Sequence, residues 1–404
     1  MLRNLGKTVI FALYTKRNIM SVVTIKRVSG RKELKTFIRF NYELYKDCPC
    51  AVPDFLEDTL DTFNPKKNPA FEFCEAEFFL AMRDGRIVGR IAVIINHKAN
   101  ETWGTRNARF GWIDFVDDPE VSRALMDTAE QWARDHGMDA LEGPLGFTDM
   151  DPEGMLTGGY DQLSTMATIY NYPYYPVHME KLGYEKEVDW VERKITVPTP
   201  GHEAHMDKYF RVAEISAGRY NLRVKKFKHV SEIRRDGYAY RIFRVVNEAY
   251  APLFGYTKMN ERQIDQYVNM YLPLIDLRLL TVIETAEGEP VAMGVGMPSL
   301  SRAIQKAKAR LFPFGWIHLL KALFIKHSEI ADMLLVAVLP EYQNKGVNAM
   351  IFADLIPVYQ QMGFKYAETH PQLETNEKSQ GQWAYLEAEV HKHRRCYKKI
   401  VRKE

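Results

Sequence analysis

Residues 332–348, with the sequence DMLLVAVLPEYQNKGVN, contain the pattern that decides the fold. The run from Asp332 to Leu339 is almost wholly apolar, which predicts a strand that is buried on both faces. Pro340 has no backbone N–H and therefore ends the pairing of this strand. A helix is predicted over 348–362. The chain thus passes from a buried strand, through a short loop, directly into a helix N-terminus.

The loop between this strand and this helix has the composition of a phosphate-binding site. The first amides of a helix lack intrahelical acceptors and lie at the positive end of the helix dipole, so they bind anions. Gly346 lets the backbone approach an anion without a Cβ in the way, and Lys345 adds a positive charge. The predicted anion-binding residues are Gln343, Asn344, Lys345, Gly346, Val347 and Asn348.

The same strand and loop resemble motif A of the GNAT superfamily of acyl-CoA N-acyltransferases. That motif is a strand followed by Arg or Gln, two residues, Gly, one residue, and Gly or Ala. Gln343 and Gly346 match the motif, whereas Asn348 replaces the small last residue. The resemblance implies that the loop binds the pyrophosphate of acetyl-CoA or another acyl-CoA. It also implies that the backbone of Val336 and Val338 pairs with the pantetheine arm.

The segment that begins at Glu374 resembles motif B of the same superfamily. Asn376 matches an Asn that contacts the pantetheine arm in many members. Seven residues later many members carry a Tyr that protonates the leaving thiolate, and this chain has Trp383 there. Indole is not a proton donor of that kind, so Tyr385 is the candidate acid, with simple packing as its alternative.

Acyl transfer to an amine also needs an oxyanion stabiliser and a base. The resemblance implies the backbone amide of Val338 for the first role. Asp332 is a candidate base because it lies within an apolar strand, although a water-facing carboxylate at a strand start is the alternative. Glu374 is a second candidate base, and His370 on the preceding strand is interpreted as structural. Further candidates are Glu284 and Glu341.

Both halves of the chain show the same order of predicted elements: strand, helix, helix or loop, hairpin, strand, helix, strand, helix, strand. Three stretches of the first half, Gly111–Phe115, Tyr170–Tyr175 and Glu180–Tyr184, resemble a bacterial family of tandem GNAT-like proteins. The expected fold class is therefore α/β (α+β), with two tandem GNAT-like domains. Each domain is expected to be a mixed, mostly antiparallel central sheet flanked by helices.

A Pro- and Gly-rich stretch from Pro198 to Gly201 is the predicted boundary between the two domains. It divides the chain into a GNAT-like domain over 20–198, a linker over 199–206 and a CoA-binding GNAT domain over 207–404. Residues 1–19 are expected to be an extension outside the folded core.

In the first half, Asp117-Asp118-Pro119 stands where a phosphate loop would lie. Two carboxylates repel a pyrophosphate, and proline removes a donor. The first half is therefore expected to shape the acceptor site and not to bind CoA.

The composition is that of an ordinary folded, soluble protein. A length of 404 residues exceeds one hydrophobic core and favours two domains. The net charge of +3 gives no field that would favour nucleic acid as a partner. The four cysteines are few, which favours a reducing, cytoplasmic location, and their spacing predicts no metal site. The sequence has no apolar run that predicts a membrane-spanning helix.

Two stretches have two interpretations each. The tyrosine cluster at 170–175 is either one wall of an acceptor pocket or part of a core. The basic, amphipathic insert at 299–326 either contacts anionic lipid or covers an apolar substrate, or else it is a helix pair that caps the sheet.

The favoured function is transfer of an acyl group from CoA to the amine of a small or amino-acid-like acceptor. The alternatives are a Fem-type transferase that uses aminoacyl-tRNA and a CoA-binding protein without turnover. Acceptor identity, acyl length and oligomeric state are left open by the sequence.

Overall fold

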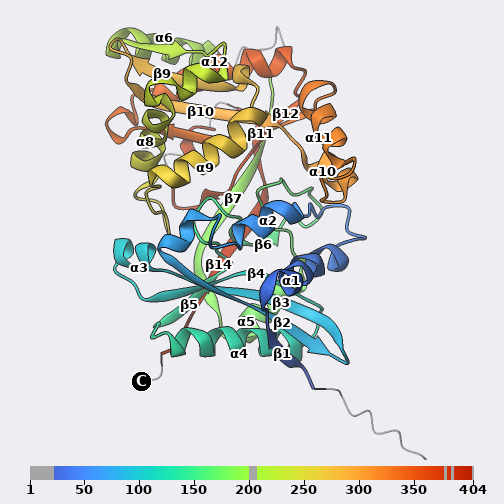
Figure 1. Ribbon diagram of the computed structural model, residues 1–404. Coiled ribbons are helices and arrows are strands. Elements are labelled where there is room, and N and C mark those ends of the chain that lie inside the picture. Colours follow the sequence, from blue (N-terminus) through green and yellow to red (C-terminus); the bar gives the residue numbers. More distant parts are fainter. Residues whose placement is uncertain (1–21, 200–206, 377–379, 384–385, 403–404) are drawn as a thin grey trace, which may run out of the picture.

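The computed structural model describes residues 22–199, 207–376, 380–383 and 386–402 (Figure 1). The predicted extension over 1–19, nearly all of the predicted linker and Tyr385 lie outside this part of the chain.

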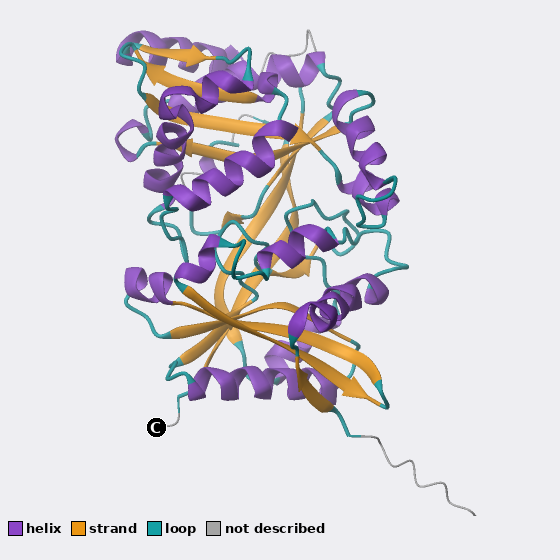
Figure 2. Ribbon diagram, viewed as in Figure 1, coloured by secondary structure: helices purple, strands orange, loops and turns teal. Residues whose placement is uncertain are grey.

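The strands of the described residues form one twisted, 14-stranded sheet that runs through both halves of the molecule (Figures 1 and 2). The order is β1-β2-β3-β4-β5-β14-β7-β12-β11-β10-β9-β8, with β6 beside β14 and β13 beside β7. The bounds of the strands are β1 Thr24–Arg27, β2 Cys74–Arg83, β3 Arg86–Asn96, β4 Asn107–Phe115, β5 Ala140–Gly143, β6 Met155–Gly158, β7 Glu185–Thr196, β8 Leu222–Lys225, β9 Leu280–Thr285, β10 Pro290–Pro298, β11 Ile330–Val338, β12 Tyr366–Thr369, β13 Gln372–Leu373 and β14 Ala388–Ile400.

Helices flank the sheet in each half (Figure 2). Their bounds are α1 Gly30–Leu44, α2 Leu56–Thr62, α3 His97–Trp103, α4 Pro119–Asp135, α5 Tyr174–Lys181, α6 Asp207–Tyr220, α7 Val230–Arg234, α8 Tyr238–Tyr250, α9 Glu261–Tyr271, α10 Ser301–Ala307, α11 Gly315–Phe324 and α12 Val347–Gln361. In the part of the chain that the structure describes, no helix combines the length and the apolar character needed to cross a bilayer.

Two pairs of neighbouring strands are parallel, β4 with β5 and β11 with β12, and the other pairs are antiparallel. The predicted fold class, a mixed and mostly antiparallel sheet flanked by helices in each half, is confirmed.

The two halves exchange their closing strands. Strand β14 pairs with β5, with Tyr397 opposite Gly143, and so completes the sheet of the first half. Strand β7 pairs with β12, with Tyr366 opposite Thr196, and so extends the sheet of the second half. Strands β7 and β14 also pair with each other over most of their length. The sheet therefore crosses the connection at which the sequence predicts a domain boundary, and that boundary stays a prediction.

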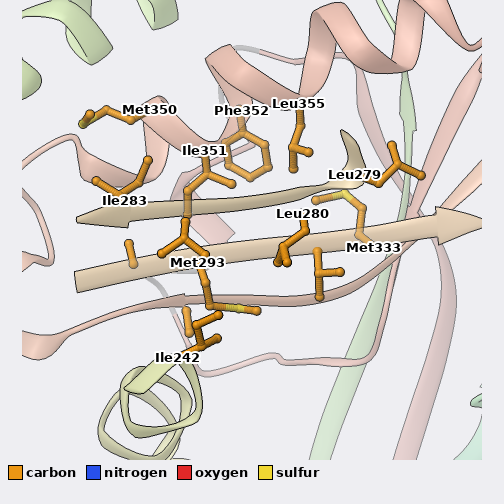
Figure 3. Packing of buried hydrophobic residues seen from close by; sticks show 14 of the residues in the cluster. Ile242, Leu279, Leu280, Ile283, Met293, Met333, Met350, Ile351, Phe352 and Leu355 are labelled. Atoms are coloured by element: carbon orange, nitrogen blue, oxygen red, sulfur yellow. The ribbon is translucent and has the colours of Figure 1, made fainter. Parts of the chain in front are cut away.

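The core of the second half lies between helices on both faces of the sheet, as the predicted fold class implies. Helix α12 packs over β9 and β10, and α8 covers the other face of β10 and β11. Figure 3 shows Ile351, Phe352 and Leu355 of α12 on one side of the strands and Ile242 of α8 on the other. A Cβ at Gly294 would lie 2.3 Å from Ile351 Cγ2, so glycine lets α12 approach the sheet closely. This packing fixes the start of α12 relative to the end of β11.

Candidate active site

Strands β11 and β12 separate at the centre of the second half. They pair from Ile330 and Tyr366 to Met333 and Thr369. Beyond these residues β12 ends, whereas β11 continues to Val338. A cavity of about 960 Å³ is lined by the last residues of β11 and by the chain that follows β12. The separation therefore gives a buried strand a free edge that faces an open volume.

A β-bulge lies where this separation begins. Val295 of β10 pairs with Leu335, and the next residue, Gly296, pairs with Met333. Leu334 is thus the extra residue on β11. A bulge turns the strand locally, which directs the following backbone groups away from the regular sheet.

The free edge of β11 belongs to Val336 and Val338, the two residues that the sequence predicts to pair with pantetheine. The amide of Leu339 donates to Val291 O at 2.9 Å. Beyond the bulge, the backbone N–H and C=O groups of odd-numbered residues therefore point toward β10, and those of even-numbered residues point toward the cavity. In agreement, Val336 O accepts a hydrogen bond from the Tyr250 hydroxyl at 3.1 Å. Val338 O accepts one from Gln343 Nε2, also at 3.1 Å. Side chains, not a neighbouring strand, thus satisfy these two carbonyls.

The predicted phosphate loop lies at the end of this edge. Residues 340–342 form a short 3-10 helix, Asn344 and Gly346 have positive φ values of 60° and 75°, and α12 then begins at Val347. No protein acceptor is recorded for the backbone amides of residues 344–348 within the described residues. Tyr342, Gln343, Asn344 and Asn348 line the cavity. The loop therefore presents free donors at the positive end of a 15-residue helix.

The reason for glycine at position 346 differs in part from the sequence expectation. A Cβ there would lie 2.5 Å from Ser216 Oγ and 2.6 Å from Val212 Cγ1, both on α6. Ser216 Oγ also donates to Lys345 O at 2.7 Å. The Lys345 ammonium lies over the rings of Tyr220 and Tyr342, at 5.1 and 5.5 Å from their centroids. Glycine at position 346 thus allows the left-handed turn and the close approach of α6. A ligand can bind to the backbone amide of this residue.

The residues that resemble motif B differ in their burial and in whether they line the cavity. Asn376 lines the cavity. Trp383 is buried, donates from Nε1 to Gln372 Oε1 at 3.0 Å and contacts Phe352, which makes it a packing residue. Glu374 is exposed and forms an ion pair with Lys186 at 3.1 Å, outside the cavity wall. The proposed roles of these residues stay predictions.

Asp332 is fully buried and does not line the cavity. Neither carboxylate oxygen has a hydrogen-bond partner among the described residues. Burial, with the nearby charge of Glu368, raises the pKa of Asp332 to about 8. A carboxyl that is protonated near pH 7 and separated from the cavity is poorly placed to accept a proton from an amine. We therefore do not assign the base to Asp332.

The burial of Asp332 predicts that Asp332→Asn stabilises the protein in a pH-dependent way. The folded-state pKa is about 8 against an ordinary value of 3.8, so folding becomes less favourable as pH rises between these values. We expect the substitution to raise the free energy of unfolding by roughly 2–4 kcal/mol at pH 8 and by much less at pH 4. Denaturant titrations at both pH values measure this difference. A catalytic Asp332 would instead show a large loss of turnover in the same variant.

Three carboxyl groups that the sequence analysis did not single out lie on the cavity wall. Asp149, Asp151 and Glu153 belong to the loop between β5 and β6, in the first half. Burial raises the pKa of Asp149 to about 7 and that of Asp151 to about 6, while the Arg109 guanidinium lowers both. Burial raises the pKa of Glu153 well above its ordinary range. A pKa near 7 is suited to a general base.

His370 also lines the cavity, next to the end of β12. Its Nε2 is buried without a hydrogen-bond partner among the described residues, and burial lowers its pKa. A neutral imidazole with a free nitrogen can accept or donate a proton, so the structural interpretation of His370 is incomplete.

Beside His370 lies a network of buried ions. Lys392 Nζ contacts the carboxylates of Glu192 and Glu368, and Arg394 contacts Glu192. The ligand atoms of Glu192, Glu368 and His391 lie within 4.8 Å of one another, a spacing that suits a metal ion. However, the Lys392 ammonium and the Arg394 guanidinium together already balance the two carboxylates, which makes the group a structural ion network.

In the first half, the positions that correspond to the gap between β11 and β12 and to the start of α12 are occupied by the protein's own backbone and side chains. Leu145 N donates to Phe110 O at 2.9 Å, so the chain after β5 continues to bond to β4. At the start of α4, the Asp118 carboxylate accepts from Glu120 N at 2.9 Å. The protein's own carboxylate thus occupies the helix N-terminus, which supports the prediction that this half does not bind CoA.

The chain has the tandem GNAT fold. It aligns with the tandem GNAT protein from the clavulanic acid biosynthesis pathway with a TM-score of 0.54, covering 95% of this chain and 99% of that chain at 14% sequence identity. No family model matches the sequence.

Two curated proteins are similar in sequence along most of the chain. Protein YghO of Escherichia coli (strain K12) is 27% identical over 387 residues, which cover 93% of this chain and 95% of that protein. The bacterial ceramide synthase of Caulobacter vibrioides (strain NA1000 / CB15N) is 29% identical over 337 residues, which cover 82% of this chain and 84% of that protein.

Proposed function

We propose that this protein is an acyl-CoA-dependent N-acyltransferase with its CoA site in the second half. The observation that carries the proposal is the set of free amides at residues 344–348, at the start of a long helix and beside a cavity. Such amides bind a pyrophosphate without further positive charge. They favour CoA over aminoacyl-tRNA as the donor, and the net charge of +3 also argues against a large RNA surface.

The free edge of β11 supports a position for the pantetheine arm. An amide-containing chain that enters the cavity can pair with Val336 and Val338 as an added strand would. The Tyr250 hydroxyl and the Gln343 side-chain amide donate to the two carbonyls in this structure, and these two hydrogen bonds have to break when the arm binds. Burial raises the pKa of Tyr250 to about 12, so its hydroxyl stays protonated and can donate a hydrogen bond to the leaving thiolate, which then takes the proton that the attacking nitrogen loses.

The carboxyl groups that the first half contributes to the cavity wall support an amine as the acceptor. A primary amine is an ammonium ion near pH 7 and must lose a proton before it attacks a thioester. The ionised carboxylate of Asp149 can attract the ammonium and then take this proton, because its pKa of about 7 keeps part of it ionised. The acyl group thereby moves from sulfur to nitrogen, and CoA leaves as the thiol.

The cavity favours an acceptor or acyl group with a long apolar chain over a small, amino-acid-like acceptor. Its wall is largely made of apolar and aromatic side chains from both halves, among them Met166, Trp190, Phe243, Leu272 and Met333. One of the similar proteins is named a bacterial ceramide synthase. A ceramide is an amide between a fatty acid and a long-chain amino alcohol, so a long-chain amine is the acceptor class that we infer.

Release of free CoA thiol from an acyl-CoA in the presence of amines of increasing chain length tests this proposal. We expect kcat/KM to rise by about three- to four-fold for each methylene, until the cavity is full, because each buried CH₂ contributes about 0.8 kcal/mol. Alcohols of the same lengths serve as controls and should not be acylated. No thiol release with any amine would contradict the enzymatic function, and equal rates for short and long amines would contradict the acceptor class alone.

A further inference from the structure

An exposed apolar surface lies on the segment 312–325, which contains α11. Seven of the sixteen large apolar side chains that are exposed among the described residues belong to this segment. They are Phe312, Phe314, Trp316, Ile317, Leu320, Phe324 and Ile325. Phe312 and Ile325 have relative exposures of 75% and 76%. An apolar surface of this extent on one short segment indicates that something covers it.

Helix α11 has one apolar face that is buried and a second apolar face that is exposed. Its inner side chains Leu319, Ala322 and Leu323 pack with Leu300 and Ile304 of the neighbouring segment. Its outer side chains Trp316, Ile317, Leu320 and Phe324 are exposed. A helix at a protein–water boundary normally has a polar outer face, so the inner packing alone does not account for this composition.

The charges around this surface all have one sign. The segment 299–326 contains six Lys and Arg residues and no Asp or Glu. Lys306, Lys308, Arg310, Lys321 and Lys326 are exposed, and no ion pair is recorded for them within the described part of the chain. An apolar face with aromatic residues and a basic rim matches the boundary between the acyl chains and the anionic headgroups of a bilayer.

The surface lies beside the cavity. Met166 and Leu334 line the cavity, and they also pack against the cluster formed by the inner sides of α10 and α11. In Figure 1, α10 and α11 lie at the outer edge of the molecule, next to β11 and β12. The cluster beneath α11 therefore borders the wall of the cavity.

We propose that segment 308–326 docks this protein on anionic membrane surfaces. Phe312, Phe314 and Phe324 enter the acyl-chain region, while Lys308, Arg310 and Lys326 contact the headgroups. The docking does not depend on acyl transfer, so it goes beyond the proposed function and can be tested without any substrate.

Flotation of the full chain with lipid vesicles tests the proposal. We expect the protein to float with vesicles of phosphatidylcholine and phosphatidylglycerol, to bind phosphatidylcholine alone much more weakly, and to be released by high salt. Replacement of Lys308, Arg310 or Lys326 by Gln should lower the partition coefficient by roughly five-fold per charge. The combined variant Phe312→Ser, Phe314→Ser and Phe324→Ser should lose vesicle binding.

The matched control replaces three exposed apolar residues elsewhere, with Val177→Ser, Ile215→Ser and Val224→Ser together. This control should float like the parent protein, and circular dichroism verifies that both triple variants are folded. Equal flotation of the two triple variants would overturn the proposal. Absence of flotation by the parent protein would also overturn it, and a dimer that the Phe variant abolishes would then show that a second copy covers the surface.

Discussion

The variant Asn348→Asp is expected to bind CoA at least five-fold more weakly than the parent protein. Asn348 lies at the second position of α12 and lines the cavity. A carboxylate there would lie within the group of free amides that we assign to the pyrophosphate. Repulsion between a unit charge and an anion at about 4 Å amounts to about 1–4 kcal/mol in a partly solvated site, which is roughly a five- to thousand-fold change in Kd.

The same substitution should leave the fold intact, because Asp is nearly isosteric with Asn and is favourable in the first turn of a helix. This separates Asn348→Asp from Gly346 variants, whose side chains would collide with Val212 and Ser216 of α6. Isothermal titration with CoA measures the effect. Ser231→Asp is the matched control, since Ser231 is the second residue of helix α7, is exposed and does not line the cavity. Unchanged affinity in Asn348→Asp would place the pyrophosphate elsewhere.

Replacement of Asp149 by Asn is expected to lower kcat by roughly a hundred-fold, within the range that a general base contributes. The KM for acyl-CoA should change little, because Asp149 belongs to the first half, whereas the free edge of β11 and the phosphate loop belong to the second. In the parent protein kcat should rise between pH 6 and pH 8, since Asp149 has a raised pKa of about 7 and only its ionised form accepts a proton. This inflection should disappear in Asp149→Asn.

Glu153→Gln is the control for the Asp149 variant. Burial raises the pKa of Glu153 well above its ordinary range and so favours the protonated side chain, for which the amide is a close replacement. Turnover and its pH profile should therefore stay close to those of the parent protein. If Glu153→Gln removed the inflection and Asp149→Asn did not, the base would be Glu153.

The sequence predicts those parts of the site that are local. The run from Asp332 to Asn348 contains a buried strand, its end and the helix start in direct succession, so pattern and turn chemistry suffice to find the loop. The choice of Val336 and Val338 on this strand rests instead on the resemblance to motif A. Gly346 shows the limit of this reasoning, because its contact with α6 joins positions that are far apart in the chain.

The acceptor side of the site could not be found in this way. Asp149, Asp151 and Glu153 stand in a glycine- and proline-rich loop of the first half, where local pattern predicts only a turn. They reach the cavity because the two halves share one sheet. The exchange of β7 and β14 has no local signal either, since each strand has the pattern of the last strand of its own half. The burial of Asp332 away from the cavity could not be predicted for a related reason, because the sequence pattern indicates a strand but not what the side chain faces.

The exchange of closing strands determines the order in which the molecule can be assembled. The sheet of the first half lacks its neighbour for β5 until β14, which follows every other strand in the chain, is available. While the polypeptide emerges from the ribosome, the edge of β5 is therefore open to mispairing. Completion of the first half has to wait for the second, and the carboxylates and the amides meet across the cavity only when the whole chain has been made.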